Sequence, residues 1–237
     1  MTTWLWLVVG GCQKTTPPEA SASAEAPAQA TATPTYALGP DASPLLLDPS
    51  HPTGPAPVSY DVRLQTSEGD VVLTVLRAWS PHAADRFYHL VRAGFYDQSA
   101  FFRTIDGFVA QFGLAANPEV NRAWRDATMP DDPPVLSNTR GRVTFAMRGV
   151  PDSRTTQLFI NLGDNGSLDR LGFAPFAEVT MGMDVVDALH RTGEGAPRGP
   201  GPSQSDIRDK GNAAIDTAFP EIDRILRATV VESGEEP

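Results

Sequence analysis

The segment Phe101-Phe102-Arg103-Thr104-Ile105-Asp106-Gly107-Phe108-Val109-Ala110-Gln111 decides the fold of this chain. Its side chains alternate as they do in β-structure. It places one arginine, Arg103, and one glutamine, Gln111, among aromatic and aliphatic residues. A guanidinium beside an apolar surface can hydrogen-bond an uncharged amide without an acid, a metal or a nucleophile. The segment therefore favours chemistry in which no covalent bond breaks.

Short strand-like runs lie on both sides of this segment. Val62 and Leu64, and then Val71 and Leu73, alternate with polar residues around a turn at 67–70, which predicts a hairpin. Further short runs lie at 100–105, 108–113, 143–147, 157–161, 175–180 and 225–231. With the helices described next, these runs predict a mainly β fold, a closed eight-stranded antiparallel β-barrel capped by two α-helices.

Two helices are expected. Ser80-Pro81 is an N-cap followed by proline at the first helical position, and Gly94 ends the apolar periodicity that follows. Residues 182–190 predict a second helix with one apolar face.

Two stretches predict loops, at 114–142 and 192–204. Beyond them, Ile207 and Ile215 predict a weak third helix, which Gly211 counts against.

Charge and composition exclude several classes of protein. A formal net charge of -10 argues against a nucleic-acid partner, because phosphates require basic patches. The single cysteine, Cys12, excludes an internal disulfide and a multi-cysteine metal site, and the four histidines show no ligand spacing. A Ser/His/Asp or Cys/His set is also missing, so hydrolase chemistry is disfavoured. We expect no metal and no cofactor.

The first residues are typical of an export signal. Residues 4–9 form a short apolar run, and Val9-Gly10-Gly11-Cys12 is similar to the lipobox of bacterial lipoproteins. This resemblance predicts a signal peptide over 1–12, with lipidation of Cys12. Residues 13–57, rich in Ala, Pro and Thr, predict a disordered linker that spans about 40 Å. A lipid anchor of this kind would hold the protein on a membrane of the cell envelope, at its periplasmic or extracytoplasmic face.

Three motifs, in this order, resemble those of the cyclophilin family of peptidyl-prolyl cis/trans isomerases. They are residues 101–111, then Thr156-Gln157-Leu158-Phe159-Ile160-Asn161, then Leu168-Asp169 with Gly172-Phe173-Ala174-Pro175-Phe176-Ala177-Glu178-Val179. The resemblance runs from about Tyr60 to Val231 and assigns 58–237 to one isomerase domain.

The resemblance implies roles for individual residues. Arg103 would be the catalytic arginine, and Gln111 would hold it and contact the substrate backbone. The residues implied to bind substrate are Phe108, Val109, Ala146, Met147, Gln157, Phe159, Leu168 and Phe173. The implied partners are proline-containing polypeptides folding outside the cytoplasm, and we expect a monomer.

The chain departs from the family pattern at the groove. Ser167 stands where well-studied members carry a tryptophan, and Phe173 where they carry a histidine. Met147 replaces a usual asparagine, and Phe112 a usual glycine. Loss of the indole predicts weak cyclosporin binding. These departures leave an alternative open: a non-catalytic or weakly catalytic proline-peptide-binding module of the cell envelope.

Overall fold

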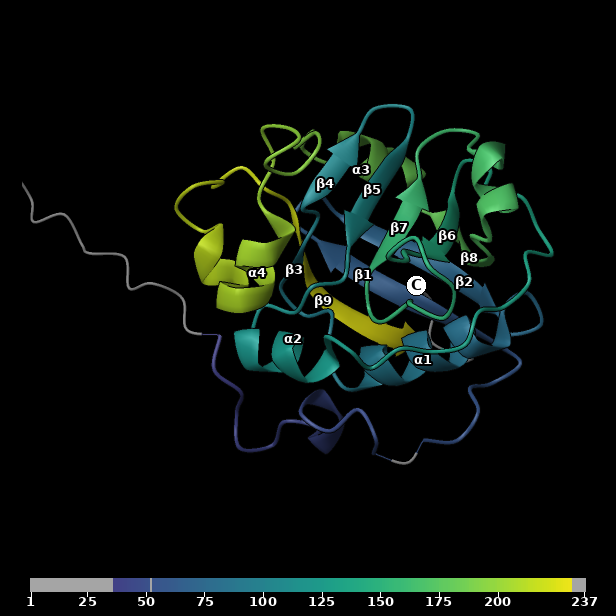
Figure 1. Cartoon of the computed structure of the whole chain (residues 1–237), viewed down its shortest axis with the longest axis horizontal. Coiled ribbons are helices and arrows are strands. Elements are labelled where there is room, and N and C mark those ends of the chain that lie inside the picture. The colour runs from purple at the N-terminus through teal and green to yellow at the C-terminus, as the bar shows by residue number, and fades with distance from the viewer. Residues whose placement is uncertain (1–35, 52, 232–237) are drawn as a thin grey trace, which may run out of the picture. The chain divides into compact units, whose positions relative to one another are not determined.

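The computed structural model describes residues 36–51 and 53–231. The expected signal peptide, Cys12 and the first part of the expected linker lie outside these residues. The described chain is mainly β, with nine strands in one antiparallel sheet and four α-helices around it (Figure 1). None of the described helices is both long and apolar enough to cross a lipid bilayer.

The sheet is built from short strands. In chain order these are β1 Ser59–Thr66, β2 Asp70–Leu76, β3 Ser99–Ala100, β4 Arg103–Ile105, β5 Val109–Phe112, β6 Arg142–Phe145, β7 Leu158–Asn161, β8 Pro175–Met181 and β9 Arg224–Val231. Their spatial order is β3-β9-β1-β2-β8-β6-β7-β5-β4. The predicted hairpin is confirmed as β1 and β2, with Val62 opposite Leu73 and both side chains fully buried.

The prediction of a closed eight-stranded barrel is wrong in its count and its closure. The run at 100–105 is two strands: β3 pairs with β9, and β4 pairs with β5. Only Phe101 and Phe102 join these two strands, which stand at opposite ends of the strand order. Because so short a link spans about 10 Å at most, the sheet must curl until its edges approach each other. In the described chain no ladder joins β3 to β4, so the sheet is a curled, open barrel.

The corner between β3 and β4 divides the core. Phe101 packs into the main core, where its ring lies 5.2 Å from that of Phe112. Phe102 points into a smaller cluster with Leu114, Ile207 and other residues. Two successive buried phenylalanines therefore anchor the corner from both sides, immediately before Arg103.

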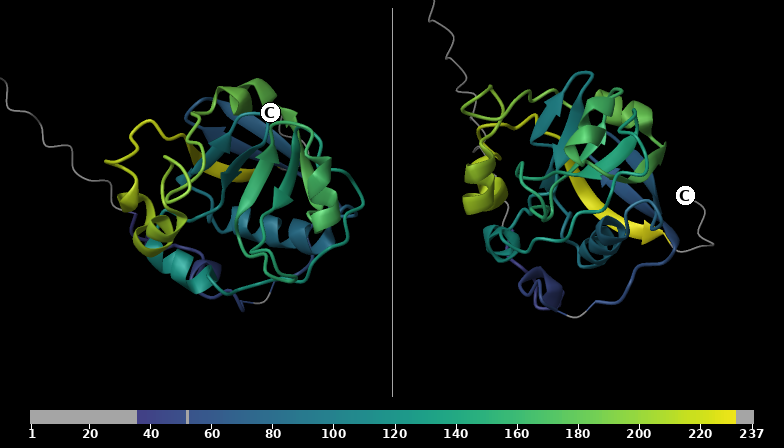
Figure 2. Two further views of the ribbon diagram at one scale, coloured as in Figure 1. Left: turned by 45° about the horizontal axis from the view of Figure 1, so that its top comes forward. Right: turned by 45° about the vertical axis from the view of Figure 1, so that its right-hand side comes forward.

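Both predicted helices are confirmed. They are α1, Pro81–Arg92, and α3, Met183–Ala188, and they lie at opposite ends of the curled sheet (Figures 1 and 2). Ser80 is the N-cap residue of α1, but its hydroxyl makes no capping bond and instead donates to the carbonyl of Pro175 at 3.0 Å. Phe87 and Leu90 on α1 are fully buried against the sheet.

Two further helices lie side by side next to the groove described below (Figure 1). The first, α2 (Pro118–Trp124), lies within the predicted loop 114–142, and Asn117 caps it by accepting from the amides of Glu119 and Val120. Asn-Pro is itself a helix-start signal, so this helix was readable from the sequence. The second, α4 (Gln204–Lys210), is the first turn or two of the predicted weak third helix, and Gly211 ends it.

The second half of the expected linker packs on the domain. Residues 44–46 form a 3₁₀ helix (η1, Pro44–Leu46), and the side chains of Leu45 and Leu46 join the main core. The indole nitrogen of Trp124 donates to the carbonyls of both leucines at 3.2 Å. The packed region therefore begins before residue 58.

Candidate active site

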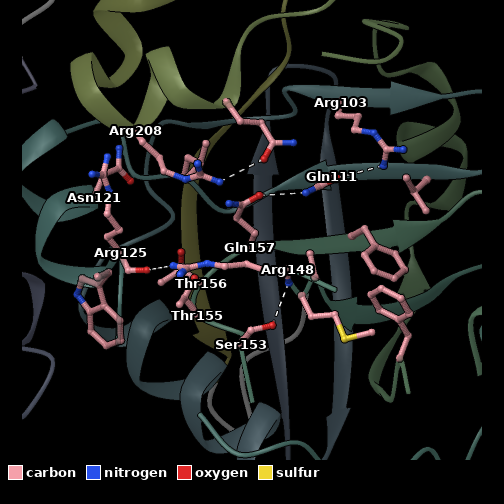
Figure 3. Close-up of a pocket in the computed structure, with 18 of the residues that line it drawn as sticks. Arg103, Gln111, Asn121, Arg125, Arg148, Ser153, Thr155, Thr156, Gln157 and Arg208 are labelled. Atoms are coloured by element: carbon pink, nitrogen blue, oxygen red, sulfur yellow. Dashed lines mark hydrogen bonds between the residues drawn. The ribbon is translucent and has the colours of Figure 1, made fainter. Parts of the chain in front are cut away.

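The hairpin β4–β5 places Arg103 directly opposite Gln111. Residues paired across antiparallel strands project to the same face. Nη1 of Arg103 donates to Oε1 of Gln111 at 3.2 Å, and Nε2 of Gln111 donates to Oε1 of Gln157 at 3.0 Å (Figure 3). The three side chains form a continuous polar row, and Gln111 is buried within it.

Glu194 is a second partner of the arginine. Nε of Arg103 donates to Oε2 of Glu194 at 3.0 Å, and Nη2 donates to Oε1 at 2.5 Å. The hydrogen bonds and charge of Arg103 hold the pKa of the Glu194 carboxyl below its usual range. The arginine is thus held from both sides, by an amide and by a carboxylate.

The loop that carries Glu194 is fastened to β4. The buried hydroxyl of Thr192 accepts from the amide of Thr104 at 2.8 Å, and the amide of Gly193 donates to the carbonyl of Thr104 at 2.9 Å. Glu194 is the only acidic residue in the predicted loop 192–204. Sequence reasoning missed it because the loop has no periodicity and lies about ninety residues from Arg103.

An apolar socket adjoins the guanidinium. Cζ of Arg103 lies 5.4 Å from the centre of the Phe108 ring, and the rings of Phe159 and Phe173 meet edge to face with centres 5.7 Å apart. Val109 and Phe159 are almost fully buried, so the socket is preorganised by the sheet. A rigid apolar hollow of this kind suits a small ring with few rotatable bonds.

The residues expected to form the site lie around one cavity of about 380 Å³. Its lining includes Arg103, Phe108, Val109, Gln111, Ala146, Met147, Gln157, Phe159, Leu168 and Phe173. Ala146 and Met147 follow β6, and the amide of Ala146 donates to the carbonyl of Gln157 at 2.9 Å. The structure thus brings every expected groove residue together, while Cys12 lies outside the described residues.

The departures from the family pattern have different locations. Phe173 lines the cavity and packs on Phe159, and Met147 also lines it. Ser167 lies exposed on η2, Gly166–Leu171. Phe112 is fully buried in the main core and does not face the cavity. Of the four departures, Phe173 and Met147 line the cavity and can affect what enters it.

Other residues that line the cavity carry no signal in the sequence. They come from α2, from the loop after β6, from the loop 192–204 and from α4, and they are Asn121, Trp124, Arg125, Arg148, Arg198, Gln204 and Arg208. Asn121 is buried and bonded to Ala115 and to the carbonyl of Ile207, so it fastens α2 to α4.

The chemistry available to this cavity is hydrogen bonding by a fixed cation beside an apolar hollow. Among the described residues, no cluster of three His, Cys, Asp or Glu side chains could hold a metal ion. A guanidinium at this place can stabilise a lone pair that develops on a nitrogen bound in the socket.

Comparison with known proteins identifies the family. Residues 61–208 match the family model described as cyclophilin type peptidyl-prolyl cis-trans isomerase/CLD. Peptidyl-prolyl cis-trans isomerase B of Escherichia coli is 35% identical over 135 residues, which cover 54% of this chain and 82% of that protein. A probable peptidyl-prolyl cis-trans isomerase of Brucella abortus is 31% identical over 179 residues, covering 71% of this chain and 81% of that protein.

Solved structures share the fold. A cyclophilin type peptidyl-prolyl cis-trans isomerase of Cryptosporidium parvum has a TM-score of 0.56 at 21% identity, covering 74% of this chain and 99% of that chain. The matched region contains β4 and β5, the groove residues and most of the sheet. This chain therefore belongs to the cyclophilin-type peptidyl-prolyl cis-trans isomerase family, and it is an isomerase of X-Pro peptide bonds.

Proposed function

We propose that this isomerase assists the folding of proteins outside the cytoplasm, and that the cavity around Arg103 is its catalytic site. The observation that carries the catalytic proposal is the guanidinium of Arg103, held by Gln111 and Glu194 at the edge of the phenylalanine-lined socket. The socket would take the proline ring, and the polar row Gln111–Gln157 would bind the backbone beside it.

Rotation about an X-Pro bond can be catalysed by a hydrogen-bond donor beside a pocket that holds the proline. The C–N bond of an X-Pro peptide has partial double-bond character, with a rotation barrier of about 18–20 kcal/mol. Rotation removes the conjugation and localises the lone pair on the proline nitrogen. An N–H group of Arg103 that donates to this lone pair stabilises the twisted state more than either planar isomer. Each tenfold gain in rate requires about 1.4 kcal/mol of such stabilisation.

Proline-containing polypeptides are the proposed substrates. The Cryptosporidium parvum relative was also crystallised in the presence of the dipeptide Ala-Pro. That finding supports the same occupant for the socket here, namely a proline and the residue before it. We propose that the protein binds such clients as a monomer.

The proposed location is the cell envelope, with the protein anchored through a lipid on Cys12. Val9-Gly10-Gly11 before that cysteine and the Ala/Pro/Thr-rich segment after it support this. In cells grown with a radioactive fatty acid, the wild-type protein should carry the label and should be found in the membrane fraction. The Cys12→Ala variant should lose both properties, and equal labelling of the two proteins would refute the anchor.

Measuring catalysis and peptide binding on the same protein separates the isomerase from the alternative, a module that only binds. The full chain should greatly accelerate the cis/trans isomerisation of a short Ala-Pro peptide. Without a catalyst this isomerisation takes tens to hundreds of seconds. A protein that binds the same peptide, as seen by NMR titration, without accelerating its isomerisation would be the non-catalytic module instead.

A further inference from the structure

The wall of the active-site cavity is positively charged although the chain is acidic. The formal net charge is -10, with 29 Asp and Glu residues against 19 Lys and Arg. Among the residues that the structure describes, the cavity lining nevertheless contains no Asp or Glu and five arginines, namely Arg103, Arg125, Arg148, Arg198 and Arg208. Such a reversal of charge at a binding groove concentrates positive potential where the substrate lies.

Two of these arginines belong to the catalytic end. Arg103 is bound by Glu194, and Arg198 is near enough to the same carboxylate to lower its pKa further. Their charge is therefore partly neutralised by one acid that lies just outside the cavity lining.

The other three arginines gather at the opposite end. Arg125 follows α2, Arg148 lies in the loop after β6, and Arg208 is on α4. Figure 3 shows them on the same side of the cavity, with Gln111 and Gln157 between them and Arg103. Nη2 of Arg148 donates to the backbone carbonyl of Arg125, which holds the Arg148 guanidinium against the end of α2. We call Arg125, Arg148 and Arg208 the arginine cluster.

The carboxylates near the arginine cluster neutralise only part of its positive charge. Arg125 pairs with Asp209 and Arg148 with Asp126, but these carboxylates are 60% and 80% exposed and neither lines the cavity. Arg208 has no carboxylate partner among residues 36–51 and 53–231, and its Nη2 donates only to Oε1 of Gln204 at 3.4 Å. Burial first, and then the charges of Arg148 and Arg125, lower the pKa of Arg208, and the nearby charge of Asp209 offsets only part of this. An anion placed between the three guanidinium groups would therefore gain most from Arg208, the one that has no carboxylate hydrogen-bonded to it among the described residues.

We propose that the arginine cluster is a subsite for a carboxylate side chain, so that this isomerase prefers X-Pro bonds with an aspartate or glutamate nearby in the substrate. The inference rests on the proposed function, because it concerns the same groove. An arginine suits this role since its planar fork can bind both oxygens of a carboxylate, and charge-assisted bonds of this kind are about twice as strong as neutral ones. The cluster lies beyond Gln111 and Gln157, so the acid would lie along the chain from the proline and not beside it.

The test is a peptide scan with the full chain. Each peptide contains one Ala-Pro bond and a single glutamate at one position, from three residues before this pair to three residues after it. Each is compared with the same peptide that carries glutamine at that position. We expect kcat/KM to favour glutamate about tenfold on one side of the proline, as a charge-assisted bond in a partly buried site allows, and to show little preference on the other.

Variants locate the preference. In the double variant Arg148→Gln/Arg208→Gln the glutamate-to-glutamine ratio should fall to about one. The ratio compares two peptides on one preparation, so a partly unfolded variant does not change it. Arg122→Gln is the control, because Arg122 lies exposed on α2 and does not line the cavity, and its ratio should equal that of the wild type.

Two results would overturn the proposal: ratios near or below one at every position of the wild-type scan, or a preference for glutamate that survives the double substitution. An enzyme that accelerates the glutamine peptides normally in either case would still be an isomerase. Failure to accelerate any peptide would overturn the proposed function as well, so the two failures are distinguishable.

Discussion

At the scale of single residues, the proposed catalysis depends on the guanidinium of Arg103. An arginine has five N–H donors in a planar fork. Glu194 accepts from Nε and Nη2, and Gln111 accepts from Nη1, which leaves one hydrogen on each terminal nitrogen for the substrate. The side chain is 17% exposed, so these partners and not water set its orientation. We therefore infer that Glu194 positions the guanidinium for catalysis.

Removing the charge of Glu194 should slow catalysis. Because a misplacement of about 1 Å can cost up to about 100-fold, we expect Glu194→Gln, which loosens the arginine only partly, to lower kcat by about threefold to tenfold. The dissociation constant of an Ala-Pro peptide should change less than about twofold, since the socket is intact. Glu221→Gln is the control, because Glu221 is 80% exposed and outside the cavity. A faster variant would show instead that Glu194 competes with the substrate for the guanidinium.

The same pair predicts how the rate depends on pH. Arg103 lowers the pKa of Glu194, so the pair is complete above the ordinary glutamate value of 4.5 and is lost as the pH falls through the lowered value. The contribution of Glu194 to the wild-type kcat should therefore be constant from about pH 8 to pH 5. The wild-type kcat should decline as the pH falls below 4.5. Circular dichroism would establish that the chain remains folded. In Glu194→Gln this decline should be missing, and an identical acid limb in both proteins would contradict the assignment.

The sequence predicted about half of the residues around the candidate site. Arg103, Gln111 and the phenylalanines lie in short strands whose local pattern is visible along the chain. Glu194 and Arg208 could not be found in this way, since they reach the cavity from a loop and a helix whose positions depend on tertiary packing. Their residue types are common on any surface, so no local signal marks them.

At the scale of elements, Gly211 shows how a helix breaker can be misread. In the sequence it counts against a helix near Ile207, but in the structure it ends α4 with φ 64° and ψ -154°, a conformation that is essentially restricted to glycine. A Cβ at this position would lie 2.1 Å from the carbonyl oxygen of Ala116. Gly211 thus lets α4 approach the chain before α2, and in this way it positions Arg208.

Gly211→Ala should destabilise the fold. The strained backbone alone costs about 1–3 kcal/mol, and the contact with Ala116 adds to this. Urea denaturation should show the loss as a lower midpoint. Gly39→Ala provides the matched control because its Cβ would meet nothing within 4 Å, and we expect a change within about 0.5 kcal/mol. Equal midpoints for the two variants would mean that α4 shifts freely.

The strands illustrate what periodicity can and cannot predict. The hairpin β1–β2 and helix α1 are confirmed. Both were predictable because the sequence of each contains its own start, periodicity and end. The break between β3 and β4 was missed, since Phe101 and Phe102 continue an apolar run while their side chains enter different clusters. A change of pairing partner is a property of the sheet and leaves no mark on the alternation.

At the scale of the whole molecule, residues 36–51 and 53–57 are part of the packed unit. Besides the two leucines of η1, Asp85 accepts from the amide of Ala56 at 2.8 Å, and the carbonyl of Gly54 lies 2.5 Å from Nε2 of His89. The segment thus covers the outer sides of α1 and α2. Composition alone did not reveal this, because two buried leucines in a stretch rich in proline and alanine change its average little.

A chain that begins at Val58 should be less stable than one that begins at Tyr36. Burial of each leucine contributes about 1.5–3 kcal/mol, so the loss should reach about 3 kcal/mol. Urea unfolding of the two chains measures it directly. If the midpoints coincide, then residues 36–57 only rest on the surface and the fold does not depend on them.

Catalysis by Arg103 is tested most directly by the isomerisation rate of an Ala-Pro peptide with the wild-type chain, Arg103→Ala and Arg103→Lys. Loss of the donor that stabilises the twisted amide should lower kcat/KM of Arg103→Ala by about 100-fold or more. Lysine keeps the charge but not the fork, so Arg103→Lys should recover only part of the loss. Unchanged circular dichroism and urea midpoints would show that both variants are folded. Rates within about threefold of the wild type for the folded alanine variant would contradict the assignment of catalysis to Arg103.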